Sequence, residues 1–193
     1  MCLACAAGLS FPASPTRADE LTARQVSDSI EKAKRFLLQM QDADGSWSRG
    51  GGLDDTYGGV PYSVGVSSLV MLALINAGMT PADREIQRGL TWLRKQKPGY
   101  TYEISLMIQA LAAAKDGIKD LPRVVALVKE LEDLQIRNGP NAGSWTYSRS
   151  QTMYGGDRSN CQFALLALRD AQEMGVPVSH DLWVRARLSR PRG

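Results

Sequence analysis

The chain has 193 residues, of which 44% are hydrophobic and 22% are charged, with 23 Lys and Arg against 20 Asp and Glu. This composition fits one domain with an apolar core and excludes a collagen-like, disulfide-framed or intrinsically disordered chain. The net charge of +3 becomes −1 without the four arginines of the last ten residues, so the body carries no basic stripe for nucleic acid. No apolar run beyond the extreme N-terminus is long enough for a transmembrane segment.

Residues 1–18 resemble a secretory leader. A short apolar stretch from Cys2 to Leu9 precedes Thr16-Arg17-Ala18, after which the chain becomes acidic. We therefore expect export to the periplasm or medium, with a cytoplasmic location as the alternative because no basic residue precedes the apolar stretch. Removal of the leader would leave Cys161 as the single thiol, which excludes an internal disulfide.

The body shows apolar residues at helical spacing and no strand alternation. This periodicity predicts six helices, at residues 26–40, 63–77, 81–95, 103–116, 122–135 and 159–174, with Pro81 in the first turn of the third. The helices at 63–77 and 103–116 are apolar nearly all round, whereas those at 26–40 and 81–95 are amphipathic. An all-apolar helix cannot face water, so we expect an inner layer of buried helices covered by amphipathic ones.

The loops between these helices share residues. Each inner helix is expected to stop at a glycine in the left-handed conformation, at Gly78, Gly117 and Gly175. The motif Gly45-Ser46-Trp47 recurs as Gly143-Ser144-Trp145, with Tyr100 at the matching place between them. A glutamine ends each outer helix, at Gln41, Gln96 and Gln135. We interpret these residues as structural: the Gln amide bridges carbonyls at the helix end, Gly permits the reversal, and the aromatic ring fills the seam between hairpins.

The segment from Lys32 to Trp47, with its aromatic, Leu, Gln and Gly-x-Trp positions, resembles the QW repeat of the prenyltransferase and squalene oxidase or cyclase superfamily. In its general sequence pattern, the chain also resembles toroid modules of exported bacterial, planctomycete-like proteins. The resemblance implies an all-α fold of three α-hairpin repeats over residues 19–186, forming an incomplete α/α toroid. Residues 181–186 would open a fourth unit, and residues 187–193 would form an unstructured, non-native tail.

For function, the resemblance implies a toroid repeat module, and we expect a non-catalytic binding or scaffolding unit that is a fragment of a longer protein. The alternative is a terpenoid cyclase or prenyltransferase acting on an isoprenoid. Partners would then be a missing C-terminal part of the same protein, or further copies of the chain through apolar sides that the first and last hairpins leave uncovered.

A cyclase of this superfamily needs an acidic cluster that protonates an alkene or epoxide. The nearest match is Asp54-Asp55, where Gly52 replaces the first acid of the pattern. The structural interpretation is a glycine-rich loop whose Asp residues cap turns or stay solvated. Paired carboxylates of a hydrolase or lyase would come from these residues with Glu103 or Asp157. The residues that we expect near a ligand cavity are Tyr62, Tyr102, Glu103, Asp157 and Asn160, and aromatic side chains of the same loops either stack on a ligand or pack the loops.

A prenyltransferase zinc site would need Asp157, Cys161 and the sole histidine, His180. The spacing of Asp157 and Cys161 departs from the family's, and a lone cysteine on an apolar helix face is usually a small core residue. A thioester of the complement type fails as well, because Cys161-Gln162 lacks the required motif. We therefore expect neither a metal nor a cofactor.

Overall fold

The computed structural model describes residues 22–47, 62–148 and 155–189, and across these ranges it contains seven helices and no strand. The predicted all-α class is therefore confirmed. The helices are α1 (Ala23–Gln39), α2 (Ser63–Asn76), α3 (Arg84–Leu93), α4 (Thr101–Ala114), α5 (Gly117–Leu134), α6 (Arg158–Glu173) and α7 (His180–Leu188). None of these seven helices has the length and apolar character that crossing a bilayer requires.

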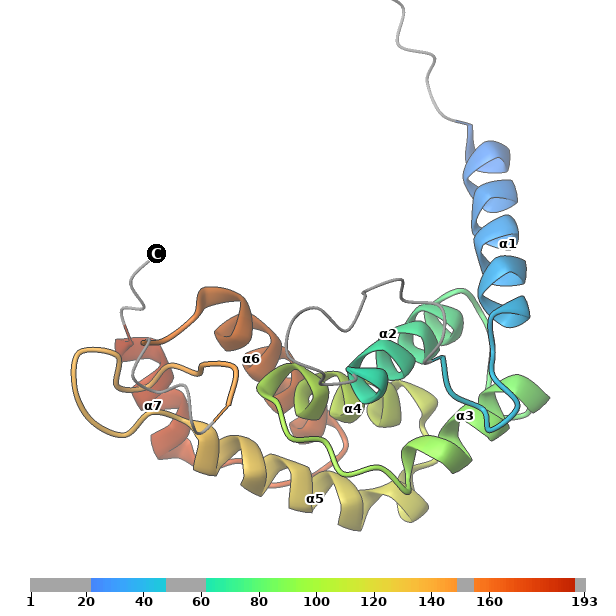
Figure 1. The fold of residues 1–193 in the computed structure, drawn as a ribbon. Helices are drawn as coiled ribbons and strands as arrows, with labels where there is room; N and C mark the ends of the chain where they lie inside the picture. Colours follow the sequence, from blue (N-terminus) through green and yellow to red (C-terminus); the bar gives the residue numbers. More distant parts are fainter. Residues whose placement is uncertain (1–21, 48–61, 149–154, 190–193) are drawn as a thin grey trace, which may run out of the picture.

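The helices α2, α4 and α6 form an inner row with α4 at its centre (Figure 1). Eleven of the fourteen residues of α4 are buried, including the fully buried Met107, Ile108 and Leu111. Its most extensive contacts are with α2 on one side and α6 on the other, and α5 covers it from below. The apolar residues of α3 and α5, such as Leu90 and Leu127, face this row and are buried.

The outer helices α3 and α5 are also joined by ion pairs. The guanidinium of Arg94, at the end of α3, donates to both oxygens of Asp120 at 2.7 and 2.8 Å and to Asp116 at 2.8 Å. The side chain of Asp120 is 1% exposed, so the bidentate pair satisfies a carboxylate that would otherwise be buried without a partner. The same guanidinium lowers the pKa of Asp116.

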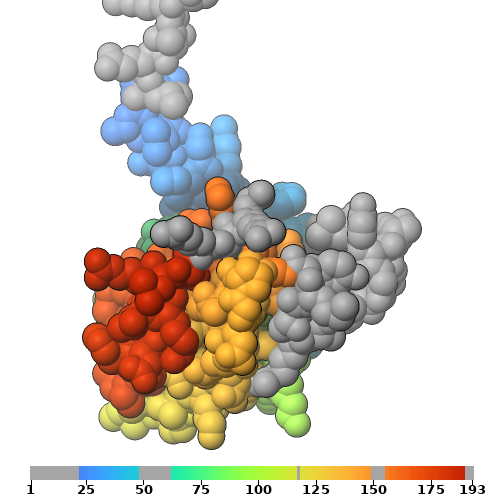
Figure 2. All heavy atoms as spheres, turned by 90° about the vertical axis from the view of Figure 1, so that its left-hand side faces the viewer, coloured from blue at the N-terminus to red at the C-terminus, as the bar shows by residue number. Residues whose placement is uncertain are grey.

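Helix α1 differs from the other outer helices because it has no buried residue. It begins with a capping box in which Thr22 and Gln25 exchange hydrogen bonds. The apolar stripe that the sequence predicts on this helix is exposed at Ile30, Phe36 and Met40, with Phe36 61% exposed. Figures 1 and 2 show α1 standing out from the body of the molecule.

The helix boundaries lie close to those that the periodicity predicts, with three differences. Helix α3 begins at Arg84, so Pro81 lies in the turn before the helix and not in its first turn. Helix α5 begins at Gly117, five residues earlier than predicted, and carries Pro122 inside it. Helix α7 continues through Arg187 and Leu188, which the sequence assigns to the tail. The expected leader, residues 1–18, lies outside the described residues.

Two of the three predicted glycine stops have the expected conformation. Gly78 and Gly175 have φ of +92° and +87°, and the residue after each donates back into the last turn of α2 or α6. The stop predicted at Gly117 is wrong, because Gly117 is the first residue of α5. Lys115 ends α4 instead, with φ +53° and a hydrogen bond from its N–H to the carbonyl of Ala112.

The left-handed backbone at Lys115 yields a stability prediction. Replacing Lys115 with glycine removes the Cβ that opposes this conformation, and we expect the free energy of unfolding to rise by about 0.5–1 kcal/mol. Lys115→Ala keeps the Cβ and is the matched control, with no gain expected. Urea unfolding followed by circular dichroism measures both variants, and a glycine variant no more stable than the alanine variant would contradict the prediction.

Candidate functional site

The loop from α1 to α2 is held by the side chain of Gln41. Its Nε2 donates to the carbonyl oxygens of Gly45 at 3.0 Å and of Glu85, in the first turn of α3, at 2.9 Å. Arg88 of α3 donates to the carbonyl of Asp42 at 2.7 Å. At Gly45 φ is +97°, and a Cβ would lie 2.6 Å from the carbonyl oxygen of Arg88. The loop therefore lies directly on the backbone of the next outer helix, which requires glycine at this point.

The loop from α5 to α6 makes the same contacts through Gln135. Its Nε2 donates to the carbonyl oxygens of Gly143 at 3.0 Å and of Leu182, in the first turn of α7, at 3.1 Å. Arg185 of α7 donates to Oε1 of Gln135 at 2.9 Å. Gly143 has φ +86°, and a Cβ there would overlap the carbonyl oxygen of Arg185. Figure 2 shows α7 in red beside the amber part of the chain that includes this loop.

Tryptophan fills the space beneath each of these two loops. Trp47 is 2% exposed and Trp145 is fully buried. Nε1 of Trp47 donates to the carbonyl of Leu37 at 2.7 Å, and Nε1 of Trp145 donates to that of Leu131 at 2.8 Å. Each ring therefore adds a second hydrogen bond to a carbonyl near the end of the preceding outer helix while burying a large apolar area.

The loop between α3 and α4 is built differently. Gln96 donates to the carbonyl of Trp92 at 3.0 Å, within its own turn, and Arg123 of α5 donates to the carbonyl of Gln96. Tyr100 is the N-cap residue of α4 with an extended backbone. The ring of Tyr100 is half-buried and lies against a second tyrosine, Tyr62, at a centroid distance of 5.5 Å.

Tyrosines from three segments meet at the N-terminal ends of α2 and α4. They line a cavity of about 230 Å³ with apolar side chains and one carboxylate; its lining residues are Tyr62, Gly65, Val66, Leu69, Tyr100, Tyr102, Glu103, Leu106 and Tyr147. The rings of Tyr102 and Tyr147 are 6.1 Å apart, and Tyr102 also contacts Phe163 of α6 at 4.7 Å. We call this cavity the tyrosine pocket. It brings together three of the residues expected near a ligand, Tyr62, Tyr102 and Glu103.

Glu103 is the acidic group of the tyrosine pocket and is 5% exposed. The backbone N–H of Gly99 donates to its Oε2 at 3.0 Å. Burial raises the pKa of Glu103, and hydrogen bonds from the backbone N–H groups of Gly99, Tyr100 and Gly65 oppose this effect. The carboxylate is therefore held by backbone dipoles at the start of α4.

Asp157 and Asn160 lie beside the tyrosine pocket and are not among its lining residues. Asp157 is the N-cap of α6, where its Oδ1 accepts from the backbone N–H of Asn160 at 2.8 Å and from the Asn160 side chain at 2.9 Å. Although burial acts to raise it, hydrogen bonds from Ser159 and Asn160 together lower the pKa of Asp157. The charge of Asp157 in turn is the main reason that the pKa of Tyr147 is raised.

The acidic residues of the cyclase pattern and the side chains considered for zinc are the other candidates from the sequence. Asp54 and Asp55 lie outside them. Cys161 is buried, and its sulfur accepts from the backbone N–H of Trp145 at 3.2 Å, as Ser67 of α2 accepts from that of Trp47 at 2.9 Å. His180 is the exposed first residue of α7. Residues 22–47, 62–148 and 155–189 hold no cluster of three His, Cys, Asp or Glu side chains fit to bind a metal.

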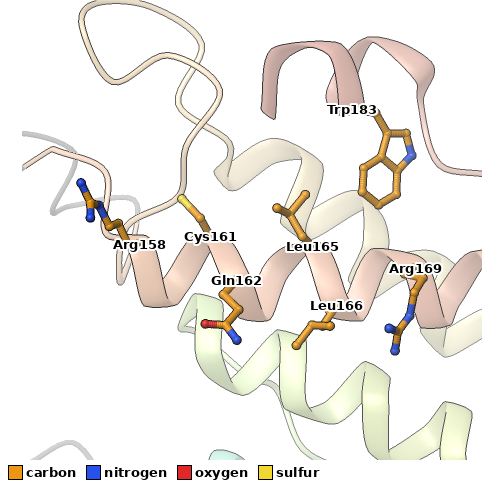
Figure 3. Close-up of a pocket in the computed structure, with 7 residues that line it drawn as sticks. All are labelled: Arg158, Cys161, Gln162, Leu165, Leu166, Arg169 and Trp183. Atoms are coloured by element: carbon orange, nitrogen blue, oxygen red, sulfur yellow. The ribbon is translucent and has the colours of Figure 1, made fainter. Parts of the chain in front are cut away.

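A larger hollow of about 570 Å³ lies between α6 and α7, and we call it the α6–α7 groove. Its lining is mostly apolar and comprises Arg158, Cys161, Gln162, Leu165, Leu166, Arg169 and Trp183. Figure 3 shows Leu165 and Trp183 pointing toward one another, with Arg158 and Arg169 at the two ends. The Arg169 guanidinium forms an ion pair with Asp170 at 2.6 Å. The sequence did not predict this groove, although Leu165 and Leu166, which are apolar residues of α6 outside its buried stripe, were a usable signal.

Comparison of the chain with family models, with curated proteins and with solved structures gave no match in any of the three.

The close approach of Gly143 to α7 yields a second prediction. Gly143→Ala places a methyl group against a backbone carbonyl, in addition to the cost of positive φ, so we expect a loss of about 2–4 kcal/mol of unfolding free energy. Gly139→Ala is the matched control, because Gly139 has φ +84° but no atom within 4 Å of the added Cβ, and about 1 kcal/mol is expected. Equal losses in urea unfolding would show that the contact with α7 is not made.

Proposed function

We propose that the chain is a helical-hairpin repeat module, of the α/α-toroid type found in the prenyltransferase and squalene-cyclase superfamily, and that it works by binding a helical partner. The observation that carries this proposal is the repetition of one set of contacts at Gln41 and Gln135. Two unrelated loops would not place a Gln amide, a Gly with positive φ and an indole N–H on equivalent carbonyls of their neighbours. The repetition supports a shared structural unit.

The same correspondence relates the sides of the inner helices. It pairs Ser67 of α2 with Cys161 of α6, because each accepts from the N–H of the loop tryptophan. The spacing in sequence that separates Ser67 from Cys161 also separates Met71 from Leu165, so these two residues correspond as well. Met71 is fully buried on α2, where its side chain lies against Gly89 of α3, whereas Leu165 is half-buried and lines the α6–α7 groove. The α6–α7 groove thus corresponds to a side of α2 that neighbouring helices bury.

This correspondence specifies the partner. An inner helix such as α4 presents Ile, Leu and Ala side chains to its neighbours, and the α6–α7 groove offers an apolar floor to such a helix. Arg158, at one end of the groove, favours an acidic residue on the partner there, whereas Arg169 at the other end is already paired with Asp170 and Glu173. We infer that the groove binds an apolar helix with an acidic residue at one end, as the next inner helix would be bound in a longer array.

A peptide with the sequence of residues 101–114, flanked by glutamates, tests this function. Binding would bury Trp183, the half-buried tryptophan of the groove, and we expect a blue shift of its fluorescence. Leu165→Glu places a charge on the apolar floor and should weaken binding at least tenfold. Trp183→Phe should remove the shift.

Leu69→Glu is the matched control, because Leu69 is a 51% exposed leucine on α2 outside the groove, and binding should be unchanged. A peptide that binds the Leu165→Glu and Leu69→Glu variants equally, or that causes no shift in the unaltered chain, would contradict the proposed function.

A further inference from the structure

The tyrosine pocket has walls suited to a positive charge. Four of its lining residues are tyrosines, Tyr62, Tyr100, Tyr102 and Tyr147, and they come from the N-terminal ends of α2 and α4 and the loop before α6. The neighbouring rings are tilted by 57° and 39° and are not stacked face to face. Aromatic faces attract a cation through their quadrupole, and several rings around one cavity are the arrangement that binds quaternary ammonium groups.

Within the described part of the chain, the charged groups at the pocket are negative. Its described lining includes Glu103 and no Lys, Arg or His. Among the residues that the structure describes, no basic side chain forms an ion pair with Glu103. Asp157 lies close enough to act on Tyr147 through its charge. A bound anion would therefore be repelled, whereas a cation would balance a carboxylate that only backbone N–H groups now offset.

The remaining walls decide which kind of cation fits. Gly65, Val66, Leu69 and Leu106 are apolar, so they cannot replace the water that surrounds a metal ion or satisfy the three donors of a primary ammonium. A quaternary ammonium carries its charge on methyl groups and has no donor to satisfy. The cavity of about 230 Å³ lies below the roughly 300–1,000 Å³ of pockets for drug-sized ligands, which restricts the occupant to a small head group.

We propose that the tyrosine pocket is a binding site for a small quaternary ammonium compound, with Tyr62 and Tyr147 as its accessible rings and Glu103 as its counter-charge. These two tyrosines are 43% and 44% exposed, so they form the mouth of the site, while Glu103 lies beneath them. This site is separate from the α6–α7 groove, so the proposal of ammonium binding does not depend on the peptide binding described above.

Titration calorimetry with choline chloride tests the proposal, with 3,3-dimethylbutan-1-ol as the neutral isostere of the same shape and sodium chloride at equal ionic strength as the salt control. We expect choline to bind at least tenfold more tightly than the alcohol, because the charge contributes the cation–π and carboxylate attraction. Equal affinity for the two compounds, or a choline dissociation constant weaker than about 10 mM, would overturn the proposal.

Substitutions of the two exposed tyrosines test whether choline binds in the tyrosine pocket. Tyr147→Leu and Tyr62→Leu replace exposed rings and should each weaken choline binding about five- to tenfold, whereas Tyr147→Phe keeps the aromatic face and should remain within about twofold. Glu103→Gln should weaken choline binding while leaving any binding of the alcohol unchanged. Phe36→Leu, which alters an exposed ring on α1, is the control. Choline affinity unaffected by both leucine variants, with circular dichroism showing that they are folded, would also overturn the proposal.

Discussion

The apolar surface of α4 extends around nearly the whole helix, and the arrangement of the other helices follows from the need to cover it. Burial of its side chains removes a large area from water, at roughly 25 cal/mol per Å². One neighbouring helix cannot bury all of these side chains, because a helix packed on one side of α4 leaves the other side exposed to water. Helices α2 and α6 cover the two sides of α4, and α5 closes it from below. The flanking inner helices are then covered by α4 on one side each.

The two candidate sites are consequences of that arrangement at its edges. The α6–α7 groove forms where the half-buried residues of α6 lie beside α7. The tyrosine pocket forms where α2 and α4 begin side by side, so that residues at both N-terminal ends meet the loop that carries Tyr147. The occupant that we propose for the first is a chain segment, and the one that we propose for the second is a small molecule. Their residues do not overlap.

Periodicity was sufficient to predict six of the seven described helices because burial imposes it directly on the sequence, whereas α7 follows no such pattern. It could not reveal that the stripe of α1 is exposed, because amphipathicity records which face is apolar and not whether a neighbour is present. Gly117 was misassigned because only Lys115 and Asp116 separate α4 from α5, and a glycine between two helices can end one or begin the next. The loops suggested tyrosines near a ligand, but the pairing of Tyr62 with Tyr100 and of Tyr102 with Tyr147 depends on tertiary packing.

The bonds of Gln41 and Gln135 have a consequence for how the molecule unfolds. Each amide donates once within its own loop and once to the helix that starts the following hairpin. A hairpin whose successor has melted would keep a buried Gln donor without its second acceptor, and its loop glycine would lose the backbone on which it rests. Through these amides, the stability of the loop after α1 depends on α3, and that of the loop after α5 depends on α7. Loss of α3 or α7 would therefore weaken the loop before it as well as the helix itself.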